Sequence, residues 1–275
     1  MHYREIHPSG LLSPYVRLFW SLEYDQTPGM AVAEKILPDG CPEIIFNMCD
    51  RFVRHDQAGT DIQPATLFAG QITRSVTVRP TGAVRLFGVR FQPSGAAAIL
   101  RRPMFELTGQ IVDLEHVLGR DSFAVAGRIH QASSLDERVA VFERFLVERL
   151  ASMSSRDGLA GRASAMLTAS RGGVSISLLS DHLGVSERRL ERAFRADIGI
   201  SPKTFARIVR FQAFVSAIQH GKTPDILDSS LEVGYYDQSH AIRDFREFSG
   251  VTPHDYFRST HRLSDAFTGV CEAQS

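Results

Sequence analysis

The sequence predicts a two-domain α+β protein, in which a small β-barrel with a helical extension precedes an all-α domain. Short runs rich in β-branched and aromatic residues alternate with turn signals up to about residue 93, and helical patterns replace them after that point. The length of 275 residues suffices for two domains of ordinary size. We therefore expect one domain at residues 1–151 and a second at residues 160–262.

The overall composition is that of a soluble globular protein. No apolar run approaches the roughly 20 residues that cross a bilayer, and the charged N-terminus lacks the apolar core of a signal peptide. Cys41, Cys49 and Cys271 lack CxxC spacing, which argues against a disulfide framework and against a zinc site. We expect a cytoplasmic protein without a membrane partner. The formal net charge of zero is unusual for a chain that binds nucleic acid.

Four segments of the first part have the composition of strands. They are VRLFWSLEY (16–24), EIIFNM (43–48), SVTVRP (75–80) and VRLFGVRFQP (84–93). The turn signals TPG, PDG, AGT and PTG separate them. Several short strands at this spacing predict a small β-sandwich or barrel.

The helical extension follows. Residues 94–118 look helical with breaks, and a clearer helix begins after Ser134, which stands at capping-box spacing from Glu137. An apolar stripe runs along that helix through Leu135, Val139, Phe142, Leu146 and Leu150. The stripe could pack on its own domain or form a dimer contact. The small, polar stretch SMSSRDGLAG (152–161) is the best candidate for the domain boundary.

An internal repeat dominates the second half. SERRLERAFRADIGISP (186–202) aligns with DQSHAIRDFREFSGVTP (237–253) at an offset of 51 residues, so that Arg192 falls on Arg243. A short helical segment that ends in glycine precedes each copy, and Ser186 or Asp237 can cap the helix that follows. A helix, a glycine turn and a newly capped helix are typical of a helix-turn-helix unit, here present twice.

The second helix of each unit has an inward and an outward face. Leu190 and Phe194 in the first copy, like Ala241 and Phe245 in the second, are four residues apart and face inward. The side chains that we expect to contact DNA are Glu187, Arg188, Arg189, Glu191, Arg192 and Arg195, with Gln238, Ser239, His240, Arg243 and Arg246. Arginine can bind guanine in a bidentate manner, and glutamine can do so with adenine. One such helix could simply be solvated, but a solvated face has no need to recur behind the same turn.

The segment between the copies predicts a connecting helix. Ser201 and Pro202 are a favourable start, and the helix runs to a stop at Gly221. About 18 residues at 1.5 Å each give a rod of roughly 27 Å. With the widths of the flanking helices added, the two outward faces could lie about one DNA turn apart, roughly 34 Å.

Residues 160–258 resemble the DNA-binding domain of AraC/XylS-family transcription regulators. LGVSERRLERAFRADIGISPKTFARIVRF and VGYYDQSHAIRDFREFSGVTP carry the resemblance. It implies double-stranded promoter DNA as the partner, contact with RNA polymerase, activation of transcription, and DNA-facing positions for Arg192 and Arg243. LPDGCPEIIFN (37–47) and residues 68–100 resemble the cupin-like sensor domains that precede such units, which implies an unknown small-molecule effector or a homodimer.

Two departures from the family pattern concern the second unit. Ser229 and Ser230 replace a usual Ile-Ala pair, and Ala241 replaces a larger apolar residue. Residues 186–210 hold seven Arg or Lys against three Asp or Glu, whereas residues 222–258 hold four against seven. We therefore expect the first unit to supply most of the phosphate affinity. The alternative is an adaptor that binds protein and has weakened DNA binding.

An enzyme is not expected. His2, His7, His55 and His116 are scattered and lack the clustering of a cupin metal site, so we expect neither metal nor cofactor. Cys41 and Cys49 could serve as a redox sensor, although cysteines near strands are more often core or turn residues. A G-x-S-x-G elbow, which a hydrolase of that type would need, is absent from the sequence.

Overall fold

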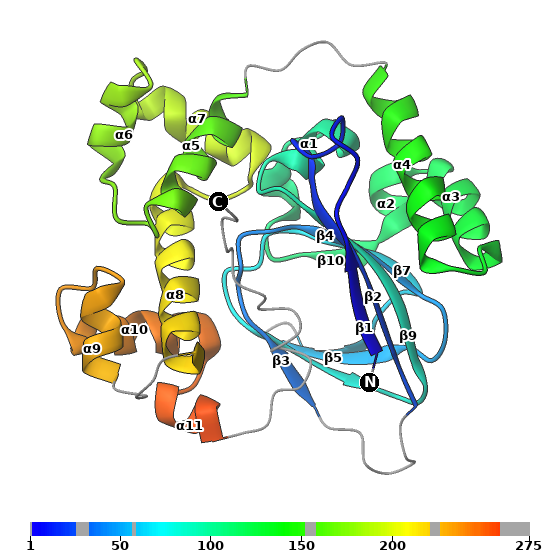
Figure 1. The fold of residues 1–275 in the computed structure, drawn as a ribbon, viewed down its shortest axis with the longest axis horizontal. Coiled ribbons are helices and arrows are strands. Elements are labelled where there is room, and N and C mark those ends of the chain that lie inside the picture. Colours follow the sequence, from blue (N-terminus) through cyan, green and yellow to red (C-terminus); the bar gives the residue numbers. More distant parts are fainter. Residues whose placement is uncertain (1, 26–32, 57–58, 152–157, 221–225, 259–275) are drawn as a thin grey trace.

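The computed structural model describes residues 2–25, 33–56, 59–151, 158–220 and 226–258 (Figure 1). A β-rich N-terminal domain with two sheets is followed by a helical C-terminal domain, as the sequence predicts. Residues 152–157 of the expected boundary, and the expected stop at Gly221, lie outside the described residues.

Two antiparallel sheets form the N-terminal domain. The larger has the order β1 (His2–Ile6), β2 (Val16–Tyr24), β9 (Val84–Phe91), β4 (Glu43–Asn47), β7 (Thr66–Ala69), β10 (Ile111–Asp113). The smaller has the order β3 (Glu34–Ile36), β8 (Val76–Pro80), β5 (Phe52–Asp56), β6 (Gly59–Ile62). The four predicted strands correspond to β2, β4, β8 and β9.

The expectation of helix for residues 94–118 is wrong at β10. Ile111 and Val112 pair with β7, across from Ala69 and Phe68. Gly109, whose φ is +71°, provides the turn that brings them there. Two adjacent β-branched residues after such a turn suit a strand edge better than a helix.

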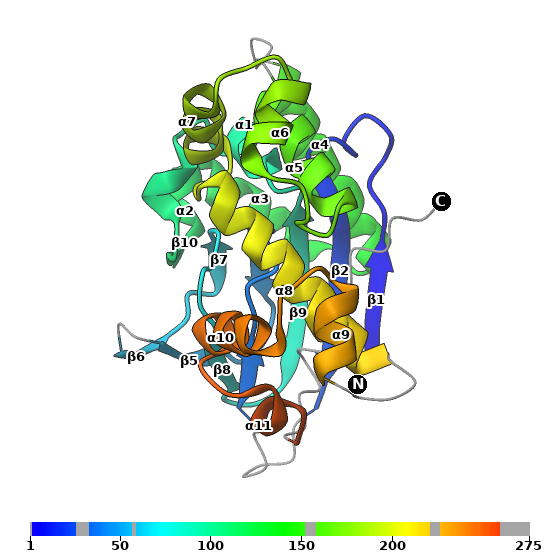
Figure 2. The same ribbon diagram turned by 90° about the vertical axis from the view of Figure 1, so that its left-hand side faces the viewer.

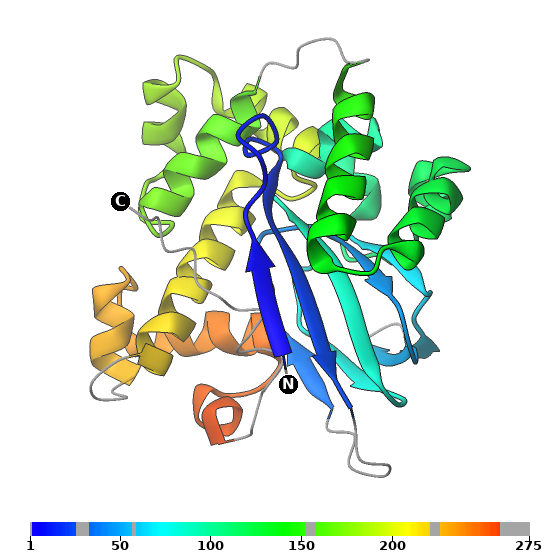
Figure 3. The same cartoon turned by 45° about the vertical axis from the view of Figure 1, so that its right-hand side comes forward.

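Helices cover one face of the larger sheet. They are α1 (Gly95–Leu100), α2 (Leu114–Leu118), α3 (Asp121–Gln131) and α4 (Leu135–Ala151), with the 3-10 helix η1 (Met104–Leu107) beside them. The apolar stripe of α4 packs here: Phe142, which is fully buried, contacts the rings of Phe19, Phe46 and Phe87. The stripe therefore belongs to its own domain and is not a free dimer contact (Figure 3).

The start of α4 is capped in a slightly different way from the expected capping box. The Glu137 amide donates to Ser134 Oγ at 3.2 Å, as predicted. The strongest hydrogen bonds to the Glu137 carboxylate come from the amide and hydroxyl of Ser133, with a smaller contribution from the Ser134 amide. These bonds lower the pKa of Glu137.

Seven helices are described in the C-terminal domain. They are α5 (Leu159–Ala169), α6 (Ile176–His182), α7 (Glu187–Asp197), α8 (Pro202–His220), α9 (Ile226–Glu232), α10 (Gln238–Ser249) and α11 (Pro253–Arg258). Figure 2 shows the pair α6–α7 near the start of α8 and the pair α9–α10 near its end. One apolar cluster runs through both pairs and α8, with Phe194, Phe205, Phe211, Phe214 and Phe245 at its centre.

Candidate nucleic-acid interface

The first recognition helix, α7, is fixed by its cap and by two buried side chains. Ser186 Oγ accepts a hydrogen bond from the Arg189 amide at 3.3 Å. Leu190 and Phe194 are fully buried, and Phe194 packs edge-on against Phe205 of α8. The six predicted contact residues of this helix are all exposed: Glu187, Arg188, Arg189, Glu191, Arg192 and Arg195.

The second recognition helix, α10, repeats this construction. Asp237 Oδ1 accepts from the His240 amide at 2.7 Å, while Ala241 and Phe245 are fully buried. Of its predicted contact residues, Ser239, Arg243 and Arg246 are exposed, and Gln238 and His240 are half-buried. The His240 ring lies edge-on to buried Tyr235, with 5.1 Å between ring centroids. Part of the His240 side chain therefore packs against Tyr235 and is not exposed to solvent.

Arg207 holds α10 against α8. Its Nη2 donates to Asp244 Oδ1 at 2.7 Å and to Glu247 Oε2 at 2.5 Å. The guanidinium also lies over the ring of Phe248, 5.1 Å from its centroid. These hydrogen bonds hold the pKa of Glu247 below its usual value.

The unusual pair Ser229–Ser230 is accommodated inside α9. Both serines are buried, and Ser230 Oγ donates to the Leu227 carbonyl at 2.8 Å. The Ser230 hydroxyl therefore has a partner within its own helix, although its side chain offers less apolar area than the family pattern.

Both recognition helices present the same end to the β-domain. Their N-terminal ends point away from the sheets and their C-terminal ends point toward them (Figure 1). Thr108 Oγ1 donates to the Gly199 carbonyl after α7, at 2.8 Å. At the end of α10, the Ser75 amide donates to Phe248 O at 2.7 Å, and Lys35 Nζ to Ser249 O at 2.9 Å.

Arg195 and Arg246, which are equivalent in the repeat, lie at this docked end. The Arg195 guanidinium lies over the Phe105 ring, 5.1 Å from its centroid. Arg246 lines a cleft with Arg74 and Thr77 of the β-domain. Arg192 and Arg243 lie three residues nearer the N-terminal ends of α7 and α10 than these two arginines, and thus farther from the docked end.

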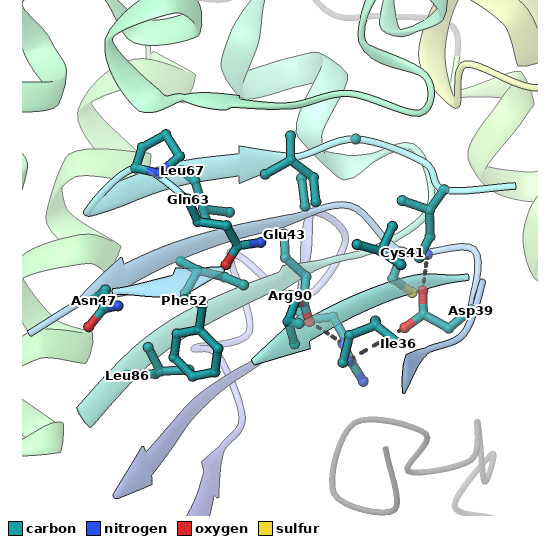
Figure 4. A pocket seen from close by; sticks show the side chains of 18 of the residues that line it. Ile36, Asp39, Cys41, Glu43, Asn47, Phe52, Gln63, Leu67, Leu86 and Arg90 are labelled. Atoms are coloured by element: carbon teal, nitrogen blue, oxygen red, sulfur yellow. Dashed lines mark hydrogen bonds and ion pairs between the residues drawn. The ribbon is translucent and has the colours of Figure 1, made fainter. Parts of the chain in front are cut away.

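A cavity of about 100 Å³ lies between the two sheets (Figure 4). Its polar end holds Arg90, whose Nε donates to Glu43 Oε1 at 2.6 Å and whose Nη2 lies 3.5 Å from Asp39 Oδ2. Burial raises the pKa of Glu43, and the neighbouring carboxylates raise the pKa of Arg90. The rest of the lining is mainly apolar and includes Phe52, Leu67, Val76, Val78, Leu86 and Ile111.

One short segment, residues 36–41, borders both this cavity and α8. Leu37 is 2% exposed and belongs to the apolar cluster of the helical domain. The Pro38 carbonyl accepts from Gln212 Nε2 of α8 at 2.5 Å. Gly40 has a φ of +80°, and a Cβ there would lie 2.9 Å from the Phe205 ring. The sequence marked PDG only as a turn, because nothing local reveals that it meets a helix about 170 residues later.

In the described part of the chain, no group of three or more His, Cys, Asp or Glu side chains is arranged to hold a metal ion. Among the same residues, no helix combines the length and apolar character needed to span a bilayer. Cys41 lines the cavity, and Cys49 is exposed; no disulfide joins the two.

Two family models match the chain. Residues 4–113 match a domain of unknown function (DUF6597), and residues 179–259 match a helix-turn-helix domain. No curated protein gives a significant match.

Solved structures with a related arrangement have low sequence identity. ToxT from Vibrio cholerae O395 is 13% identical with a TM-score of 0.49, covering 92% of this chain and 99% of that one. Unsaturated fatty acid-bound ToxT from Vibrio cholerae strain SCE256 is 14% identical with a TM-score of 0.47, covering 86% and 94%. CuxR, an AraC-like transcriptional activator, is 13% identical with a TM-score of 0.27, covering 74% and 83%.

Proposed function

We propose that this chain is an AraC-type helix-turn-helix regulator that binds promoter DNA through α7 and α10 under the control of a small molecule. The observation that carries the proposal is the repeat. Two capped helices, each held by two buried side chains four residues apart, stand near the two ends of α8 with their N-terminal ends facing away from the β-domain.

The exposed side chains suit contact with a duplex. Arg188, Arg189 and Arg192 supply cationic groups on α7 for phosphate and guanine, and Ser239 and Arg243 supply donors on α10. We propose that α7 provides the larger part of the salt-dependent affinity, because residues 186–210 hold seven Arg or Lys against three Asp or Glu, whereas residues 222–258 hold four against seven.

Control by an effector would pass through residues 36–41. A molecule in the cavity changes the environment of Asp39 and Arg90, and the same segment packs on α8 through Leu37, Pro38 and Gly40. A ligand that binds one arrangement of this segment more tightly shifts the population of that arrangement, and with it the position of α8. We further propose that the regulator activates transcription through RNA polymerase and can act as a homodimer, as the family resemblance implies.

Fluorescence anisotropy with a duplex from the bound promoter, at two salt concentrations, tests DNA binding. We expect affinity to fall steeply as salt rises, since bound arginines release counterions from the phosphates. Arg192→Ala should weaken binding by about 5- to 150-fold, which corresponds to the roughly 1–3 kcal/mol of a good base contact. Arg195→Ala should have a smaller effect, because its guanidinium already lies on Phe105.

Arg128→Ala is the matched control, since it removes an equally exposed arginine from α3 on the other side of the β-domain. Binding without any salt dependence would contradict the proposal and favour the protein-binding adaptor. Equal losses for Arg192→Ala and Arg128→Ala would overturn the role given to α7.

A further inference from the structure

The charged end of the inter-sheet cavity contains more acidic than basic groups. Among the described residues that line it, the charged side chains are Asp39, Glu43 and Arg90. The Arg90 side chain is 5% exposed and faces both carboxylates, with its Nε bonded to Glu43. The single buried guanidinium is therefore shared by two carboxylates, and it offers no uncompensated positive charge to an anionic ligand. Arg17 reaches the Cys41 sulfur at 4.0 Å, but it is not among the lining residues.

The remainder of the cavity favours an apolar body. Side chains from both sheets meet there, including Phe52 and Val78 of the smaller sheet and Leu67 and Leu86 of the larger (Figure 4). The Asn47 amide is already engaged, because its Nδ2 donates to Asp50 O and its Oδ1 accepts from the Cys49 amide. Most of the binding free energy in such a cavity comes from apolar contact, and a few polar groups fix orientation.

We propose, building on the proposed function, that the cavity takes a small, mainly apolar molecule that carries a hydrogen-bond donor and no acidic group. A buried anion beside Asp39 and Glu43 would face like charge, or would have to take Arg90 from its partners. A hydroxyl or ammonium group can instead donate to the carboxylate oxygens, each of which accepts more than one hydrogen bond. Burial raises the pKa of Glu43, and its protonation would leave this end neutral rather than positive.

Two isosteric ligand series test the charge preference on the full-length protein. The probes are 2-naphthylmethanol, 2-naphthylmethylammonium and 2-naphthoate, together with benzyl alcohol, benzylammonium and benzoate, measured by calorimetry and by thermal shift. The alcohol or the ammonium of at least one series should bind saturably and raise Tm, and its carboxylate should bind at least tenfold more weakly. A carboxylate that binds as well as its partners would overturn the proposal, as would no saturable binding in either series.

Asp39→Asn provides a gain-of-function test. The substitution keeps the shape of the side chain but leaves Arg90 with one carboxylate partner, so carboxylate binding should strengthen at least tenfold. Asp136→Asn is the matched control, because it removes the same charge from an exposed site on α4. Unchanged carboxylate affinity in a folded Asp39→Asn protein would contradict the assigned role of this end. If that variant does not fold, the comparison of probes on the unmodified protein still decides.

Ala69→Phe locates the binding site. Ala69 lines the cavity on β7, and a phenyl group there should abolish binding of every probe; retained binding would show that the probes bind elsewhere and would overturn the proposal. Anisotropy with promoter DNA, run without ligand, separates the two hypotheses. Intact DNA binding with a reversed order of probes refutes only the ligand class, whereas absent DNA binding refutes the proposed function whatever the probes do.

Discussion

Gly88 on β9 lies directly opposite Trp20 on β2, and the indole covers the space where a side chain would stand. A Cβ at position 88 would come within 1.9 Å of the Trp20 ring. Trp20 is fully buried in an apolar cluster that also includes Val78 and Leu86, so its ring cannot move aside without disturbing the packing of that cluster. The glycine is therefore required by packing and not by backbone conformation.

Gly88→Ala should lower the free energy of unfolding by about 1–3 kcal/mol, the usual cost of overpacking a filled core. Urea denaturation followed by the emission of Trp20, the single tryptophan, measures it directly. Gly127→Ala is the control: it lies within α3 with nothing within 4 Å, and should be neutral or add up to about 1 kcal/mol. Equal stability of the two variants would show that Trp20 adapts.

Residue-level prediction from the sequence worked where helical periodicity governs burial. Leu190, Phe194, Ala241 and Phe245 all face inward, because positions four apart share a face whatever the tertiary contacts are. The contact of Arg195 with Phe105 could not be foreseen, since it joins residues 90 positions apart in two domains. The DNA-contact set itself remains a prediction.

At the scale of elements, the attachment of α10 to α8 depends on a compact polar cluster. Asp244 is only 2% exposed, and Arg207 is its ion-pair partner on α8. Tyr235 also donates to Asp244, and burial raises the pKa of this tyrosine. A buried carboxylate that lost its arginine would be left with much less compensation for its desolvation.

Arg207→Met should destabilise the helical domain by about 1–3 kcal/mol at neutral pH, because it keeps the apolar stem but removes both ion pairs. The pKa of Glu247 is depressed in the folded state, so its contribution is present above the unfolded value near 4.5 and is lost as pH falls through the folded value. Thermal melts from pH 7 to pH 3 should therefore show a smaller acid-induced loss in the variant.

Arg171→Met is the matched control for this cluster. Arg171 pairs with Glu232 at 3.8 Å, but both side chains are more than 60% exposed, and such pairs contribute little. A loss of stability in Arg171→Met as large as in Arg207→Met would show that the buried cluster contributes no more to the free energy of unfolding than an exposed ion pair.

The strands of the β-rich domain could be predicted from the sequence only in part. The segments that became β2, β4, β8 and β9 carry dense β-branched and aromatic composition, and their bounds agree with the sequence within two residues. β10 has three residues and forms a strand only because it pairs with β7. Three residues are too few to show the alternation of apolar and polar side chains that would predict a strand from the sequence. The β-rich domain could thus be predicted from the sequence as a sandwich or barrel, but the edge strand β10 could not, and β1, β3, β5, β6 and β7 also have no counterpart among the four predicted segments.

For the whole molecule, the β-domain contributes to the placement of both recognition helices. Thr108 contacts the end of α7, and Lys35 and Ser75 contact the end of α10. Together with α8, these contacts restrict the separation of the two helices. From the sequence, only α8 was expected to set the distance between the two recognition helices. The contacts of the β-domain could not be predicted, because hydrogen bonds to main-chain carbonyls do not depend on which side chain the acceptor residue carries.

Fixed separation predicts a strict requirement for half-site spacing. Inserting five base pairs between the two contacted segments of a mapped promoter should place them on opposite faces of the duplex and remove the contribution of α10. Arg243→Ala should then have no further effect on the spaced duplex, although it weakens binding to the natural one. Anisotropy on both duplexes measures this coupling, and full affinity for the spaced duplex would contradict a rigid arrangement.

The contacts at the ends of α7 and α10 use the carbonyls of Gly199, Phe248 and Ser249 as acceptors. A carbonyl is present whatever side chain its residue carries. Under the proposed function, mutations on the outward faces of the recognition helices could therefore alter the preferred operator while these main-chain contacts to the β-domain persist. A chain built in this way would acquire new target genes without losing the contacts through which we propose that an effector acts.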